Sequence, residues 1–122
     1  MNYDDFLIRI IDDGIEAAKA DYTKPEESHK LEGSLAGFEL CRGQSPTELL
    51  SLFYDARSEV SRLLREQADL KTYWYAVCRE AEIEWVCNCV GAMLVNQGIE
   101  PVAPVMARGA MKAAEVVGVR GA

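Results

Sequence analysis

Residues 71–97 read KTYWYAVCREAEIEWVCNCVGAMLVNQ, and this stretch decides the fold. Plotted at about 100° per residue, its apolar side chains fall on two opposite sides of one long helix. The first stripe consists of Trp74, Cys78, Ala81, Trp85 and Ala92, and the second of Ala76, Ile83, Cys87, Val90 and Leu94. A helix at the edge of a small domain needs only one apolar stripe. We therefore expect this helix in the middle of the packing, or at the centre of an oligomer.

Four further helices and no strand are predicted along the rest of the chain. They cover approximately residues 4–21, 23–42, 46–67 and 105–117. At 122 residues the chain is long enough for one domain with a real core. The predicted fold class is all-α, a compact bundle of about five helices around a long central helix, in a single domain that spans residues 1–122.

Local signals mark two of the predicted helix starts and one close packing contact. Ser45 to Glu48 combine a cap, a proline at the first helical position and an acid at the third. Thr23 and Glu26 have the same capping-box spacing. Gly33 and Gly37 lie four residues apart within the second helix, each at a cost of about 1 kcal/mol relative to alanine. This cost favours tight packing against another helix over a ligand that approaches the glycines.

Net charge limits the classes of partner. The chain has a formal charge of −7 and a pI near 4.7, and residues 1–39 alone hold ten acids and four bases. Direct nucleic-acid binding needs a positive stripe, so we do not expect it. The acidic N-terminal part could engage a basic protein partner, or it could simply be a solvated face.

The sequence predicts no membrane span and a cytoplasmic location. No apolar run reaches the length of about 18 residues that a span needs, because charged residues from Arg79 to Glu84 interrupt the richest segment. The N-terminus is acidic and lacks the basic leader of a signal peptide. The four cysteines fall within apolar helical patterns. Cys87 and Cys89 would point about 200° apart on a helix, so we interpret them as buried structural thiols and not as zinc ligands.

The best candidate for a ligand or metal site is the line Glu80, Glu84 and Asn88, which steps by four residues along the long helix. Two carboxylates one turn apart can bind a divalent cation or share a proton. The competing interpretation is a polar seam that an arginine or lysine of a neighbouring helix satisfies. Ser58, Ser61, Arg62 and Arg65 could form an anion site, but Glu59 and Glu66 lie among them.

Aromatic residues and the second apolar stripe favour self-association. Three consecutive aromatic residues begin at Tyr73, and they cannot all face one core. The first three helices are expected to cover the side of Trp74 and Trp85, while the slim last helix, with Met106, leaves part of the other side open. The predicted interface residues of a homo-oligomer are Tyr73, Tyr75, Ile83, Cys87, Val90 and Leu94.

These observations favour a non-enzymatic protein-interaction or regulatory module, of the kind found among small bacterial or phage accessory proteins. No catalytic residue and no cofactor is predicted, since the chain has no phosphate-binding glycine-rich loop and no nucleophile motif. The alternative is a small-ligand or divalent-metal-dependent helical enzyme, similar to a nucleotide hydrolase, that uses Glu80 and Glu84.

Overall fold

The computed structural model describes the backbone of residues 1–100 and 103–117, and side chains up to residue 109 and at Met111. Over these residues the chain forms five α-helices, one short 3-10 turn and no strand, which confirms the all-α prediction. The elements are α1 (Tyr3–Asp21), the 3-10 turn η1 (Pro25–Glu27), α2 (Ser28–Cys41), α3 (Pro46–Arg65), α4 (Leu70–Asn96) and α5 (Pro104–Val117).

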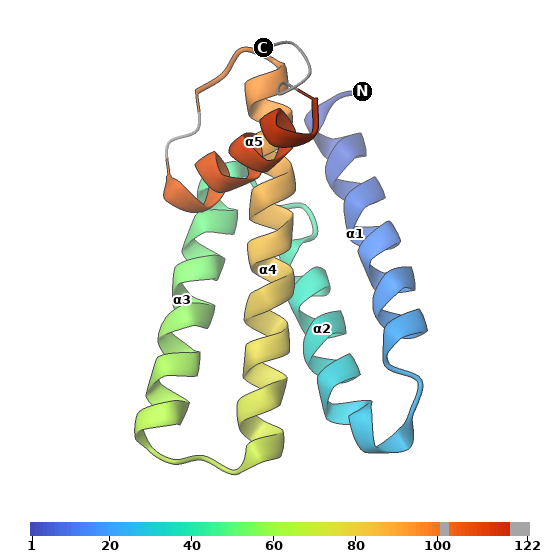
Figure 1. Cartoon of the computed structure of the whole chain (residues 1–122), viewed down its shortest axis with the longest axis vertical. Helices are drawn as coiled ribbons and strands as arrows, with labels where there is room; N and C mark the ends of the chain where they lie inside the picture. The colour runs from blue at the N-terminus through green and yellow to red at the C-terminus, as the bar shows by residue number, and fades with distance from the viewer. Residues whose placement is uncertain (101–102, 118–122) are drawn as a thin grey trace.

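The long helix α4 lies in the middle of the molecule, as the two apolar stripes predict. In Figure 1, α3, α4, α2 and α1 lie across the view in that order; α2 and α4 run up the view, and α1 and α3 run down it. Helix α5 crosses α4 near its C-terminal end. The contacts of α4 are made mainly with α2, α5 and α3. Every other helix is therefore arranged around α4.

Side-chain caps fix the starts of α1, α3 and α4, at Asn2, Ser45 and Asp69. Ser45 Oγ accepts a hydrogen bond from the Glu48 backbone N–H, and the Glu48 carboxylate accepts one from the Ser45 N–H, so the predicted capping box is present. The prediction at Thr23 is wrong: residues Pro25–Glu27 form a 3-10 turn instead, and α2 begins at Ser28 without a side-chain cap. A proline is tolerated at the start of an α-helix and at the start of a 3-10 turn. The spacing from Thr23 to Glu26 therefore did not discriminate between the two structures.

The glycines of α2 bring its backbone against that of α4. A Cβ placed on Gly33 would collide with the carbonyl oxygen of Tyr75, and one on Gly37 would lie 2.6 Å from the carbonyl oxygen of Arg79. The prediction that Gly33 and Gly37 serve helix packing is thus confirmed. Through these two glycines α2 packs closely against one face of α4, and other faces of α4 remain for α3 and α5.

The core gathers large apolar side chains from all five helices. Phe38, Phe53 and Ile83 are among its largest fully buried side chains. The fully or almost fully buried members are Leu7, Ile11, Phe38, Cys41, Leu49, Phe53, Ile83, Val86, Cys87, Val90, Val105 and Met106. Among the residues that the structure describes, no helix is long and apolar enough to cross a membrane.

Candidate functional site

The two carboxylates of the predicted ligand site lie half-buried on α4, next to an arginine of α3. Burial raises the pKa of Glu80, the neighbouring Glu84 carboxylate raises it further, and the Arg57 guanidinium partly opposes both effects. No ion pair joins Arg57 to Glu80 or Glu84 in the part of the chain that the structure describes. This geometry favours the interpretation of Glu80 and Glu84 as a polar seam that faces Arg57 of α3, over their interpretation as a metal site.

Asn88, the third member of the line, lies beneath α5. A Cβ on Gly109 of α5 would collide with the backbone carbonyl oxygen of Asn88. The side-chain Oδ1 of Asn88 is buried and has no hydrogen-bond partner among the described residues. Across those same residues, no group of three or more His, Cys, Asp or Glu side chains is arranged to hold a metal ion.

The structure corrects the predicted interface on the second apolar stripe. Ile83, Cys87 and Val90 are 0% exposed, so they belong to the core of a single chain and are not available to a second copy. Leu94 is half-buried and packs against the same core. The remaining predicted interface residues, Tyr73 and Tyr75, are half-buried.

Helix α5 explains why the stripe is covered. The sequence predicts α5 as too slim to close that side, yet Val105 and Met106 are 1% and 0% exposed against α4. Gly91 of α4 and Gly109 of α5 let the two backbones touch, since a Cβ on Gly91 would collide with the carbonyl of Met106. A slim helix that approaches this closely can cover the stripe with Val105, Met106 and its own backbone.

The side of α4 that remains exposed is the one expected to be covered. Leu70, Trp74 and Trp85 are 72%, 40% and 39% exposed, and Ala81 is exposed between the two tryptophans. We call these four residues the uncharged face. On this side of the helix the positions between and beyond them are Val77, Asn88, Ala92 and Val95. No charged residue therefore interrupts this side of α4 from Leu70 to Val95.

Both tryptophans are held by contacts within the chain. The ammonium group of Lys30 lies 5.1 Å from the centre of the Trp74 ring, a cation–π contact. The ring of Trp85 meets Phe38 edge-to-face at a centroid distance of 6.0 Å. Each indole thus has a fixed position and still presents more than a third of its surface to solvent.

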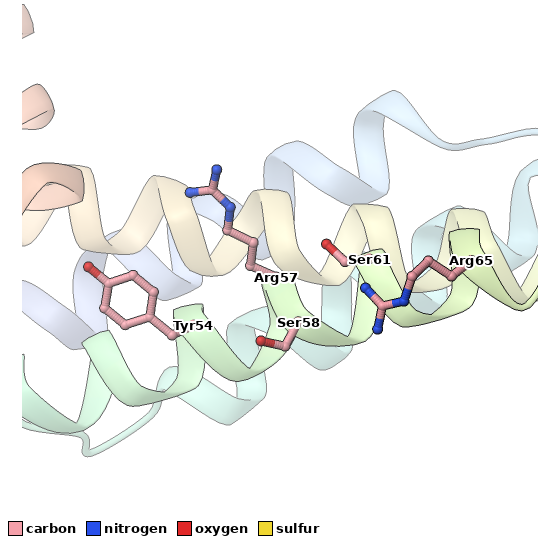
Figure 2. Close-up of a pocket in the computed structure, with 5 residues that line it drawn as sticks. All are labelled: Tyr54, Arg57, Ser58, Ser61 and Arg65. Carbon is pink, nitrogen blue, oxygen red and sulfur yellow. The ribbon is translucent and has the colours of Figure 1, made fainter.

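A second feature is a shallow pocket of about 400 Å³ on α3, which we call the α3 pocket (Figure 2). Its lining consists of Tyr54, Arg57, Ser58, Ser61 and Arg65. Of the residues considered from sequence for an anion site, Ser58, Ser61 and Arg65 are present, and Arg57 and Tyr54 join them. Arg62 is absent because it points elsewhere: its guanidinium binds the carboxylates of Glu59 and Glu66.

The thiols match the interpretation as structural residues. All four cysteines are free; Cys41, Cys78 and Cys87 are buried, and Cys89 is half-buried. Burial raises the pKa of Cys41 and of Cys87 to about 12, and that of Cys89 to about 11. These three side chains therefore remain protonated thiols at neutral pH, which makes them poor nucleophiles and poor metal ligands.

Comparisons with protein-family models, curated proteins and solved structures found no match to this chain. The functional argument consequently rests on the uncharged face and on the α3 pocket. One sequence signal pointed to the first of these: eight positions on one side of a 27-residue helix without a charge. No sequence signal determines the lining of the α3 pocket, because this lining depends on the direction in which each arginine side chain extends.

Proposed function

We propose that this protein is a non-enzymatic protein-interaction module that associates with itself through the uncharged face of α4. The observation that carries the proposal is the exposure of Trp74 and Trp85 on a side of α4 that has no charged residue of its own, beside the Lys30 ammonium that α2 places over Trp74. Tryptophan is among the residues most enriched at interaction hot spots, and charged residues are depleted from interface cores. An exposed patch of this composition is typical of a surface that another protein covers.

A second copy of the chain fits this face for a geometric reason. Trp74 and Trp85 are eleven residues apart, roughly 16 Å along the helix, and the small Ala81 lies between them. Two copies of α4 that pair antiparallel place Trp74 of one copy beside Trp85 of the other, with each Ala81 near the two-fold axis. Such an isologous contact buries the uncharged face of both copies. The small side chain of Ala81 at its centre permits the two copies of α4 to approach each other closely.

The size of the face sets the expected strength. Each tryptophan offers on the order of 100 Å² of exposed surface, so the four residues together supply about 400 Å² per copy. A standard stable interface buries about 800 Å² per partner. The dimer is therefore expected to be weak, to form only at high protein concentration and to be in exchange with the monomer.

The acidic surface of α1 is a separate feature, and we propose it as the contact for a basic partner. Its exposed acids are Asp4, Asp5, Asp12, Asp13 and Glu16. Within the described residues, Arg42 at the C-cap of α2 binds Asp12 and Lys19 pairs with Glu16, and the other three acids form no ion pair. A partner held by these charges would dissociate as salt is added.

Light scattering over a concentration series tests the self-association. Wild-type protein at roughly 100 µM should run as a dimer, and the emission of its tryptophans should shift to the blue as concentration rises. Ala81→Glu places a charge at the centre of the uncharged face and should leave a folded monomer. The matched control is Ala20→Glu, the same substitution at an exposed position of α1, which should remain dimeric. A wild type that is monomeric throughout the series contradicts the proposal.

A further inference from the structure

Every side chain that lines the α3 pocket can donate a hydrogen bond to an anion. The lining holds two guanidinium groups and three hydroxyls, from Tyr54, Arg57, Ser58, Ser61 and Arg65. No carboxylate lines it, although acids outnumber bases by 20 to 13 in the whole chain. The pocket is thus a locally positive site on a protein whose net charge is −7.

The arginines of α3 divide into two groups by what they contact. Arg62 is neutralised, because its guanidinium donates to Glu59 at 3.0 Å and to Glu66 at 2.6 Å. Neither Arg57 nor Arg65 has an ion-pair partner within the described part of the chain. Arg57 and Arg65 therefore keep their guanidinium hydrogen bonds available for a ligand, and Arg62 does not. Arg57 also lies near the half-buried carboxylate of Glu80.

The spacing of the donors suits an extended anion. Arg57 and Arg65 are eight residues apart, about 12 Å along α3, with Ser58 and Ser61 between them. Figure 2 shows the Arg65 side chain extending back along α3 toward Ser61, while Arg57 extends toward α4. Donors that are spread over this length suit an extended anion, whose charges are also spread out, better than they suit a single small ion.

We propose that the α3 pocket binds an oligophosphate, a small molecule with two or more linked phosphoryl groups. Arg57 and Arg65 bind its terminal oxygens, since the planar guanidinium matches phosphate in a bidentate arrangement. Ser58, Ser61 and Tyr54 donate from their hydroxyls to the oxygens between. This site is separate from the uncharged face of α4, and it goes beyond the proposed self-association.

Titration of the whole protein with sodium tripolyphosphate, followed by calorimetry and by the melting temperature, tests the proposal. Saturable binding should raise the melting temperature by mass action, while sodium chloride of equal ionic strength should not. Orthophosphate should bind more weakly than tripolyphosphate, because it cannot reach both arginines at once.

Matched variants locate the binding. Arg57→Ala with Arg65→Ala should weaken tripolyphosphate binding by at least about tenfold, as expected for the loss of charge-assisted hydrogen bonds. The control pair, Arg9→Ala with Arg108→Ala, removes the same charge from exposed positions outside the pocket and should change the affinity by less than about twofold. Ser58→Ala with Ser61→Ala leaves the charge unchanged and should still weaken binding.

Three outcomes would overturn the proposal. The first is the absence of saturable binding to tripolyphosphate in the wild type. The second is an equal loss of affinity in the two arginine pairs, which would show attraction by net charge alone. The third is unchanged affinity in the serine pair together with equal affinity for orthophosphate and tripolyphosphate.

Discussion

Gly33 of α2 lies directly against the backbone carbonyl of Tyr75 in α4, so that no Cβ fits between the two helices at this point. The backbone of Tyr75 is part of the long helix α4 and cannot move aside as the end of a flexible side chain would. The distance between α2 and α4 therefore depends on the absence of a side chain at Gly33.

The first prediction is that Gly33→Ala destabilises the protein. In an exposed helix this substitution stabilises by about 1 kcal/mol, because alanine has the higher helix propensity. At Gly33 the methyl group must push the two helices apart, and we expect a net loss of about 2 kcal/mol or more, as for other overpacked sites. Chemical denaturation measures this change in the free energy of unfolding. Glu32→Ala, at the neighbouring exposed position, is the control and should change the stability little. A Gly33→Ala variant as stable as wild type would contradict the prediction, because it would show that α2 can move away from α4 without loss of stability.

The second prediction separates the core stripe of α4 from its uncharged face. Ile83→Glu or Val90→Glu buries a charge at a position that is 0% exposed, so each variant should lose cooperative thermal unfolding. Trp74→Glu changes a position that is 40% exposed and should keep the helical circular dichroism spectrum. A folded, monomeric Ile83→Glu variant would instead favour the interface predicted from sequence.

The third prediction concerns divalent ions at Glu80 and Glu84. Magnesium, manganese or zinc should shift the melting temperature little, because two carboxylates on one helix make a weak site unless further ligands complete it. A large saturable shift with one of these ions that disappears in Glu84→Ala would favour the metal-dependent enzyme instead.

The fourth prediction concerns the pH dependence of stability. The pKa of Glu80 is raised in the folded state above its ordinary value of 4.5, so the folded protein holds this proton more tightly than the unfolded chain does. Stability should therefore fall as pH rises from about 4.5 through the folded pKa, and the loss should persist at neutral pH. Glu80→Gln removes this contribution.

Urea denaturation at pH 7 and at pH 4 measures the effect of Glu80→Gln. The variant should be more stable than wild type at pH 7, and the difference should shrink at pH 4, where the wild-type carboxyl is protonated in both states. If Glu80→Gln were less stable at pH 7, the attraction of Arg57 would outweigh burial and the repulsion of Glu84.

Much of the bundle can be predicted from the sequence, because its helices depend on local signals. The apolar periodicity of residues 71–97 predicts a helix that matches α4 (Leu70–Asn96) to within one residue at each end. The pairing of Arg62 with Glu59 and Glu66 also follows from spacings of three and four residues. Such features depend only on neighbours along the chain.

Only the tertiary structure decided which side of α4 is exposed. Helical periodicity gives the angle between the stripe of Trp74 and that of Ile83. Because both stripes are apolar, this angle does not predict which of them α5 covers. The answer depends on Gly91 and Gly109, 18 residues apart in the chain, which let the backbones of α4 and α5 meet. In the same way, the α3 pocket depends on the direction in which Arg57 and Arg65 extend, and a rotamer is set by space around the side chain that the sequence does not describe.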